Sequence, residues 1–277
     1  MKADKLLQAL EQRGIHTIIG VPDSTLKQFC DGLQNYKGNI NHYVPVNEGA
    51  AVGLALGSYL ADGKPACVYM QNSGIGNAVN PIASLANRDV YGIPMLFLVG
   101  WRGEPGVKDE PQHVFQGKIT CKLFEVLSIP YEVIDKDTTW EQMESILTEA
   151  FETLSGGEQF AIIVRKGTFE KDVPYTWENG NTLNREEALA TILKEGGHEA
   201  ILVSTTGKIS RELYEQSDAL YGTHENIFMT VGGMGHASMI ALGIAKKRPK
   251  EKIMCIDGDG AALMHMGALA FISSQSP

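Results

Sequence analysis

Short, almost continuously apolar runs alternate along this chain with segments whose apolar residues recur at helical spacing, and this alternation most constrains the fold. Examples of the apolar runs are "ACVYM" at 66–70, "PMLFLVG" at 94–100 and "FAIIVR" at 160–165. Strands of this kind suit a parallel sheet that is covered by helices on both faces. The sequence therefore predicts an α/β fold with doubly wound, mainly parallel sheets.

The alternation is interrupted at residues 167–183, where "GTFEKDVPYTWENGNTL" is polar and irregular, as a linker would be. The same alternation then restarts in a shorter region, 184–277. A chain of 277 residues is long enough for two domains of ordinary size. We therefore expect one domain at 1–166, a linker at 167–183, and a second, incomplete domain at 184–277.

An internal echo links the two regions. "LALG" at 54–57 and "QNSG" at 71–74 correspond to "IALG" at 240–243 and "DGDG" at 257–260, each displaced by 186 residues. The order of helix end, apolar strand and glycine-bearing loop is also the same. A repeated order at a fixed spacing indicates duplication of one structural unit. Under this displacement Glu48 corresponds to Met234.

Composition excludes several classes of function. The net charge of −9 argues against a nucleic-acid partner, because phosphate neutralisation needs a basic face. No apolar run approaches the roughly 20 residues of a membrane span, and the N-terminal "MKADKLLQALEQRG" is typical of an amphipathic helix rather than a signal peptide. The four cysteines form no CxxC pair, and Cys67 and Cys255 lie in apolar runs. We expect a cytoplasmic protein with buried, reduced thiols.

The "DGDG" segment, Asp257–Gly260, directly follows the apolar run "KIMCI". Ligands of open α/β sheets bind beyond the carboxyl ends of the strands, and glycines allow a close approach of the backbone. The N–H groups of Ala261, Ala262 and Leu263, at the start of a helix expected over 261–273, form a candidate anion site. A carboxylate beside an anion site suggests a Mg²⁺ ion shared with ligand phosphates. An ordinary polar turn remains the alternative.

A dinucleotide-binding fold is a competing interpretation. "GMGHAS" and "GIGNAV" resemble the GxGxxG fingerprint, but neither has glycine or alanine at the sixth position. Both are therefore weak matches.

Two further residues have open interpretations. Glu48 begins a helix whose body is small and apolar; it is either an acid favoured by the helix dipole or a carboxylate that exchanges a proton with a ring nitrogen in apolar surroundings. Met234 is flanked by Gly232, Gly233 and Gly235, and is either a core methionine or a side chain that projects against a ligand.

The segment 99–113, "VGWRGEPGVKDEPQH", is irregular, rich in glycine and proline, and carries Arg102, Lys108 and His113. It is either a solvated surface loop or a loop at the strand ends that receives an anionic substrate.

Seven segments occur in an order that resembles the thiamine-diphosphate-dependent decarboxylases, and the resemblance covers essentially the whole chain. They are "GVPDS", "VNEGAAVGLALG", "MQNSGIGNAVNP", "GWRGEPGVKDEPQH", "TTGKISRELYE", "VGGMGHASMIALG" and "IDGDGA". Within that family the chain is similar to the phosphonopyruvate decarboxylases, and the loop starting at "GWRGEPG" favours these over the related sulfopyruvate decarboxylases. An acetolactate-synthase-like carboligase and a non-catalytic α/β binding module remain as alternatives.

The resemblance implies a pyrimidine-binding domain at 1–166 and a partial diphosphate-binding domain at 184–277. It implies the cofactors thiamine diphosphate and Mg²⁺, with each cofactor between subunits of a homo-oligomer. The implied reaction is decarboxylation of a small anionic 2-oxo acid, 3-phosphonopyruvate, to phosphonoacetaldehyde and CO₂ in phosphonate biosynthesis.

The resemblance also implies roles for individual residues. Glu48 bonds the aminopyrimidine and activates the cofactor, Asp259 binds Mg²⁺, and Met234 supports the bent cofactor. Asp257 is expected to be a turn or capping residue. From loop position and charge, and not from the resemblance, Arg102, Lys108 or His113 is expected to meet the phosphonate, with Asp23 and Ser73 near the reacting carbon. Further cofactor contacts are expected at Thr206, Gly207, Gly233, Gly258, Gly260 and Ala261.

One part of the family pattern is missing from this sequence. The resemblance implies a second side-chain ligand for Mg²⁺, an asparagine that lies one helix and one strand beyond "GDG". The residues after Gly260 contain no asparagine. The chain thus resembles a C-terminally truncated family member, and we expect it to bind Mg²⁺ and cofactor poorly and to have weak or no activity.

Overall fold

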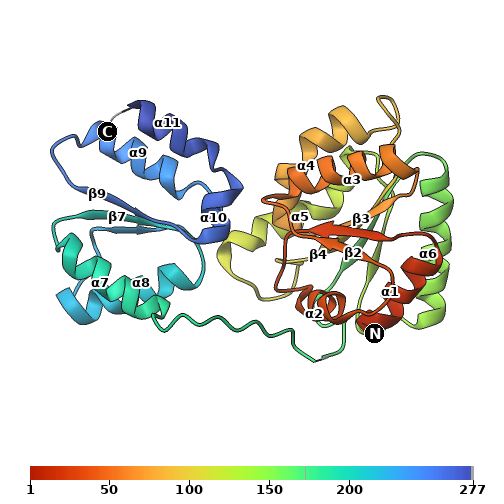
Figure 1. The fold of residues 1–277 in the computed structure, drawn as a ribbon, viewed down its shortest axis with the longest axis horizontal. Helices are drawn as coiled ribbons and strands as arrows, with labels where there is room; N and C mark the ends of the chain where they lie inside the picture. Colours follow the sequence, from red (N-terminus) through yellow and green to blue (C-terminus); the bar gives the residue numbers. More distant parts are fainter. Residues whose placement is uncertain (172, 276–277) are drawn as a thin grey trace. The chain divides into compact units, whose positions relative to one another are not determined.

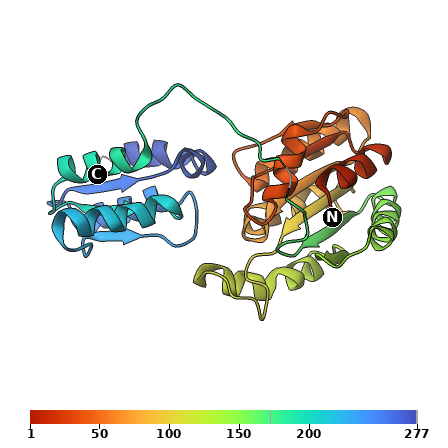
Figure 2. The same cartoon turned by 90° about the horizontal axis from the view of Figure 1, so that it is seen from below.

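The structure is a computed structural model that describes residues 1–171 and 173–275. The chain divides into two compact units, Met1–Trp177 and Glu178–Pro277, and each is described by itself (Figures 1 and 2). The division falls inside the segment 167–183 that the sequence indicated as a linker.

The first unit contains a six-stranded sheet of order β2-β1-β3-β4-β6-β5, and all of its strand pairings are parallel. Helices lie on both faces of this sheet (Figure 2). The strands are β1 (Thr17–Gly20), β2 (Asn41–Tyr43), β3 (Ala66–Gln71), β4 (Met95–Gly100), β5 (Tyr131–Ile134) and β6 (Gln159–Val164). The helices are α1 (Ala3–Gln12), α2 (Lys27–Asn35), α3 (Glu48–Asp62), η1 (Asn72–Gly74), α4 (Ile75–Pro81), η2 (Ile82–Ala86), α5 (Pro111–Val126) and α6 (Trp140–Ser155).

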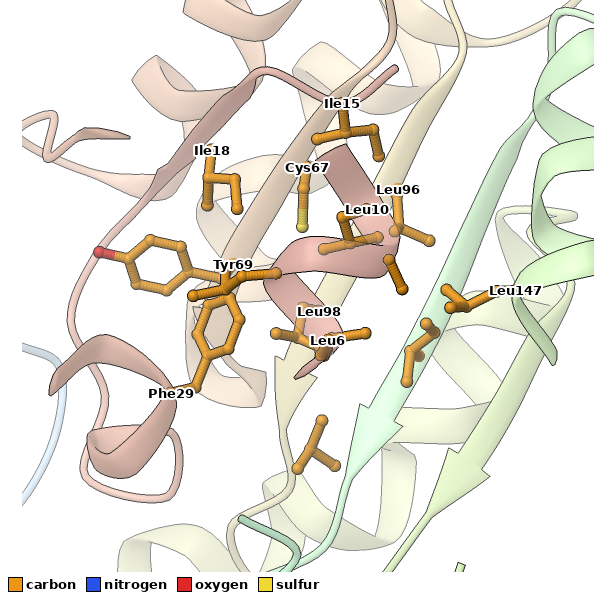
Figure 3. Close-up of a cluster of buried hydrophobic side chains, with 14 of the residues drawn as sticks. Leu6, Leu10, Ile15, Ile18, Phe29, Cys67, Tyr69, Leu96, Leu98 and Leu147 are labelled. Carbon is orange, nitrogen blue, oxygen red and sulfur yellow. The ribbon is translucent and has the colours of Figure 1, made fainter. Parts of the chain in front are cut away.

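The central strands of this unit are buried on both faces, as their continuous apolar runs predicted. Cys67 and Tyr69 of β3 pack with α1, α2 and α6 into one hydrophobic cluster, part of which Figure 3 shows. Val68 and Met70 of the same strand pack into another cluster, with α3 and α4. This alternation is what a strand between two helical layers requires.

The second unit contains a three-stranded parallel sheet of order β8-β7-β9. Its strands are β7 (Ile201–Ser204), β8 (Ile227–Met229) and β9 (Ile253–Ile256). Its helices are α7 (Arg185–Gly196), α8 (Lys208–Tyr221), α9 (Ala237–Lys247), α10 (Asp259–Met264) and α11 (Gly267–Gln275). The order repeats the β2-β1-β3 part of the first sheet, and the displacement of 186 carries residues 41–43 of β2 onto 227–229 of β8. Both sheets confirm the predicted α/β fold class.

Several local predictions were wrong. The helix expected over 261–273 begins earlier, at Asp259, and is broken after Met264, because the backbone of His265 (φ −133°, ψ 43°) leaves the helical region. The apolar segment "HYVPV" at 42–46 also predicts a strand, but β2 ends at Tyr43, before Pro45, which has no N–H group to donate to a sheet.

The cysteine prediction holds in part. All four cysteines lie among the described residues and are free thiols, and Cys67 is buried. Cys255 is exposed instead, because β9 is an edge strand of the sheet as described. Among residues 1–171 and 173–275, no helix is both long and apolar enough to cross a membrane.

Gly20 gives a test of the close packing between β1 and β3. A Cβ atom at this position would collide with the backbone carbonyl and the ring of the buried Tyr69, so we expect Gly20→Ala to lower the free energy of unfolding by about 1–3 kcal/mol. Urea unfolding followed by tryptophan fluorescence would measure this change. All three tryptophans, Trp101, Trp140 and Trp177, belong to the first unit and therefore report on it.

Gly57 is the matched control, because it is exposed within α3 and a Cβ atom there meets open space. Gly57→Ala should stabilise the protein by about 1 kcal/mol through its higher helix propensity. Equal effects of the two substitutions would contradict the packing argument.

Candidate active site

The polar residues predicted in the first unit follow the carboxyl ends of its parallel strands. Asp23 follows β1, Glu48 follows β2, Ser73 follows β3 and Arg102 follows β4. In a parallel sheet these ends lie along a single edge, where ligands of open α/β folds bind.

Glu48 is the first residue of α3, which Asn47 caps by accepting a 2.8 Å hydrogen bond from the Ala50 N–H. The Glu48 side chain is only 5% exposed. A side chain at Gly74 would collide with its Oε1 atom, so glycine at this position makes room for the carboxylate. Asn77 Nδ2 donates to Oε2 at 2.8 Å. Glu48 is therefore a helix-start acid whose carboxylate is also enclosed, and its exchange of a proton with a ring nitrogen stays a prediction.

Asp23 is a buried carboxyl group with one unmatched oxygen. Its Oδ2 accepts hydrogen bonds from the N–H groups of Thr25 (3.0 Å) and Leu26 (3.1 Å), whereas Oδ1 has no partner among the described residues. Burial raises the pKa of Asp23, although these hydrogen bonds act in the opposite direction. Gly100 leaves the space that the carboxyl group occupies. The Asp23 carboxyl group is thus shifted toward its protonated form by burial.

Asn72 joins the ends of β3 and β4, and the sequence interpretation did not assign it a role. This fully buried side chain donates to the Arg102 carbonyl (2.8 Å) and to Thr120 Oγ1 (2.8 Å), and accepts from the Arg102 N–H (3.1 Å). Its own carbonyl accepts from Gln116 Nε2 at 3.2 Å. The available signal was a polar residue placed directly after a buried strand.

Arg102 is held by Asp109, another residue that the sequence interpretation missed. The guanidinium donates from Nε (2.8 Å) and Nη2 to the two carboxylate oxygens of Asp109, and Nη1 donates to Ser24 Oγ at 3.0 Å. The Arg102 guanidinium holds the pKa of Asp109 well below its usual range. The charge of Arg102 is therefore compensated by a neighbour in its own loop.

The other predicted substrate residues are less constrained. Lys108 is exposed and forms no ion pair with any described residue. His113 lies half-buried in the first turn of α5, where burial and then the positive charge of Arg102 lower its pKa. Ser73 is exposed, and its Oγ accepts from Gln71 Nε2 at 2.6 Å. Of the predicted set, the structure brings Asp23 and Arg102 together, through Ser24 between them.

The predicted residues of the second unit gather at the corresponding edge of its sheet. Thr206 and Gly207 follow β7, Gly233 and Met234 follow β8, and Asp257–Gly260 follow β9. Thr206 Oγ1 donates to the Val231 carbonyl at 2.9 Å, which ties two of these loops together. The terminal methyl of Met234 lies 4.0 Å from the position of a Cβ at Gly260. Met234 is 39% exposed, so it projects from its loop rather than filling the core.

The backbone of this edge is open to a ligand. Gly207 and Gly233 have φ values of +94° and +64°, a region that favours glycine, and no described atom lies within 4 Å of a Cβ at Gly207. α8 begins at Lys208 without a side-chain cap from any described residue, which leaves its first N–H groups available to an anion.

The anion site predicted at Ala261, Ala262 and Leu263 needs correction. Because α10 begins at Asp259, the Ala262 N–H already donates to the Gly258 carbonyl at 2.8 Å, and Ala261 is buried. The Gly260 N–H donates to Asp259 Oδ1 at 2.8 Å. No group of three or more histidine, cysteine, aspartate or glutamate side chains in the described ranges could hold a metal ion. The exposed Asp259 could bind Mg²⁺ only together with oxygens from a ligand.

The two edges offer the donors and acceptors that thiamine diphosphate requires. The enclosed carboxylate of Glu48 suits a ring nitrogen, whereas the open backbone around Gly207 and the exposed Asp259 suit a diphosphate with its metal ion. The residues present therefore fit the cofactor that the resemblance implied.

Comparisons with known proteins agree with this fit. Residues 2–124 match the family described as thiamine pyrophosphate enzyme, N-terminal TPP binding domain, and residues 207–275 match the corresponding C-terminal TPP binding domain. Phosphonopyruvate decarboxylase from Streptomyces hygroscopicus is 31% identical over 100% of this chain and 70% of its own length. Sulfopyruvate decarboxylase from Methanosarcina acetivorans is 26% identical over 99% of this chain and 72% of its own.

Among solved structures, a thiamine diphosphate-dependent 4-hydroxybenzoylformate decarboxylase from Rhodococcus jostii RHA1 is 16% identical. It matches with a TM-score of 0.46 over 92% of this chain and 44% of that chain. A TM-score of this size is too low to support an argument about the fold or the function.

Asp23 provides a pH-dependent test of its buried carboxyl group. Its folded pKa is raised, so its contribution to stability is complete below its ordinary pKa of about 4 and is lost as the pH rises through the folded pKa. We therefore expect Asp23→Asn to be more stable than the wild type at pH 7, and this advantage to disappear below about pH 4. Urea unfolding followed by tryptophan fluorescence at several pH values would measure it.

Asp89→Asn is the control, because Asp89 is exposed and no shift in stability is expected. A variant Asp23→Asn that is less stable than the wild type at pH 7 would contradict the interpretation.

Proposed function

Because the chain belongs to the thiamine-diphosphate-dependent decarboxylases, we propose that it converts 3-phosphonopyruvate to phosphonoacetaldehyde and CO₂ in phosphonate biosynthesis. The observation that carries this proposal is the 31% identity to a phosphonopyruvate decarboxylase along the whole chain. The cationic residues of the loop after β4 agree with a substrate that carries a second anionic group.

When bound, thiamine diphosphate supplies a thiazolium ring that accepts the electron pair released with CO₂. In this proposal residues 1–166 bind the pyrimidine, where Glu48 holds a ring nitrogen. Residues 184–277 bind the diphosphate through Thr206, Gly207, Gly233 and Gly258. Asp259 would bind a Mg²⁺ ion together with the diphosphate, and Met234 would contact the bound cofactor.

The protein residues handle protons and charge. Glu48 exchanges a proton with the ring nitrogen from an enclosed position, where water competes little for it. Burial raises the pKa of Asp23, which makes this carboxyl group the candidate proton donor near the reacting carbon. Ser73 at the same edge is exposed and can hydrogen-bond the 2-oxo acid.

The phosphonate requires cationic partners, and the candidates differ in availability. The guanidinium of Arg102 is paired with Asp109, and its Nη1 donates to Ser24. It could therefore donate an oriented hydrogen bond to the phosphonate, but Asp109 neutralises most of its positive charge. The side chain of His113 favours its neutral form. Lys108 is the loop cation whose charge no described residue compensates, and we assign it the main electrostatic contribution.

A homo-oligomer belongs to the same proposal, with each cofactor between domains of different subunits. Apolar side chains are exposed on α3 at Leu54 and Leu60, and on α9 at Ile240. Contact between subunits would remove such surfaces from water.

The substrate assignment predicts a ranking of 2-oxo acids. We expect weak activity overall, but with the protein loaded at saturating thiamine diphosphate and Mg²⁺, kcat/KM for CO₂ release should be highest for phosphonopyruvate, lower for sulfopyruvate and lowest for pyruvate. The order follows from the charge that each substrate offers to the loop cations. A higher value for sulfopyruvate would identify the chain as a sulfopyruvate decarboxylase, and the 26% identity to such an enzyme makes that the second candidate.

The role of Lys108 predicts a substrate-dependent loss. Lys108→Ala should lower kcat/KM for phosphonopyruvate by about tenfold to a hundredfold, the effect of one hydrogen bond to a charged group. The value for pyruvate, which has no phosphonate, should stay unchanged. Steady-state kinetics on both substrates would measure the difference.

Lys118→Ala, an exposed lysine of α5, is the control and should change neither value. Arg102→Ala should lower kcat/KM for phosphonopyruvate as well. An unchanged value in either Lys108→Ala or Arg102→Ala would remove that residue from phosphonate binding.

A further inference from the structure

Asn77 is the described side chain that holds the Glu48 carboxylate, and the sequence interpretation assigned it no role. Its Nδ2 atom donates to Glu48 Oε2 at 2.8 Å. An ionised carboxylate only accepts hydrogen bonds, so the amide nitrogen of Asn77, and not its oxygen, must face it.

The backbone fixes this contact from both sides. At Gly49, a Cβ atom would lie 2.7 Å from the Asn77 carbonyl oxygen, so α3 and α4 approach closely where Glu48 begins its helix. Gly74 lies at the start of the same segment, and its missing side chain leaves room for Oε1. The segment Gly74–Asn77 therefore contacts both carboxylate oxygens, with the glycine beside Oε1 and the asparagine amide on Oε2.

Glu48 lies in surroundings where the hydrogen bond from Asn77 has little competition from water or from other acids and bases. Glu48 is 5% exposed, and the segments that touch it, Asn72–Gly74 and Ile75–Pro81, contain no titratable side chain. No second acid or base in those segments can therefore share its proton. A hydrogen bond to a buried charged group is also stronger than one between neutral groups.

We propose that Asn77 is a positioning residue that keeps Glu48 Oε2 as an acceptor and leaves Oε1 as the oxygen that exchanges a proton with the cofactor ring. In that exchange the O–H bond on Oε1 breaks as an N–H bond forms on the ring nitrogen, and the reverse step restores it. The inference rests on the proposed role of Glu48 and adds a second residue to it.

The test separates activation of the cofactor from its binding. In Asn77→Leu, exchange of the C2 proton of bound thiamine diphosphate with deuterated solvent should slow by about tenfold to a hundredfold, the loss of one hydrogen bond to a charged group. The Kd for thiamine diphosphate with Mg²⁺, measured by calorimetry, should stay close to the wild-type value. NMR of quenched samples would follow the exchange.

Asn80→Leu is the matched control, because Asn80 is exposed in the same helix, as Asn77 is, but only Asn77 of the two donates to Glu48. It should leave the exchange rate unchanged. Asn77→Asp is a second variant of nearly the same shape, which removes the donor and adds a like charge, and it should also slow the exchange. Exchange at the wild-type rate in either Asn77 variant would overturn the inference.

Glu48→Gln distinguishes this inference from the proposed function. If Glu48→Gln leaves the exchange unchanged, the role of Glu48 itself fails, and the inference fails with it. If Glu48→Gln slows the exchange and Asn77→Leu does not, only the inference fails. Without cofactor, Glu48→Ala should move the ¹⁵N NMR signal of the Asn77 side-chain amide and leave that of Asn80 in place; an unmoved Asn77 signal would also overturn the inference.

Discussion

The side-chain amide of Asn72 is the interaction on which the edge of the first sheet depends. Parallel strands bring their carboxyl ends to one edge, but nothing in the sheet ladder fixes the loops beyond it. Asn72 supplies this link, because it uses its amide nitrogen and oxygen to join the end of β3 to the end of β4 and to α5. Because the Asn72 side chain has no exposed surface, leaving its amide without hydrogen bonds would destabilise the folded protein. The loop that carries Arg102 and the segment that encloses Glu48 therefore start from fixed positions.

Charge at this edge is handled by pairing within the loops rather than by an excess of one sign. Arg102 is matched by Asp109, Glu48 is held by the neutral amide of Asn77, and burial favours the protonated form of Asp23. The charge of Lys108, which pairs with no described residue, then adds to an edge whose other charges are nearly compensated. Paired charges of this kind destabilise the folded protein little when no substrate is bound, and the charge of Lys108 can still attract the second anionic group of a substrate.

Much of this could be predicted from the sequence, because it depends on local patterns. Continuous apolar runs such as "ACVYM" predicted parallel strands buried on both faces, and β3 packs in that way. A helix that begins at Glu48 was predicted from the small, apolar residues that follow it, and α3 begins there. Predictions failed where a local signal was ambiguous. The helix after "DGDG" begins two residues early, and Cys255 is exposed because burial of a strand depends on which strands lie beside it.

The sequence by itself determined the α/β class, the repeated order of helix end, strand and loop, and the residues that match the thiamine-diphosphate-dependent decarboxylases. Each of these follows from periodicity, spacing or motif. Only the tertiary structure decided the partners. It paired Arg102 with Asp109, joined Asn72 to the Arg102 backbone and to Thr120, and placed Asn77 on Glu48. Hydrogen bonds of this kind are short-ranged and directional, so they depend on how helices and strand ends meet in space, which spacing along the chain does not specify.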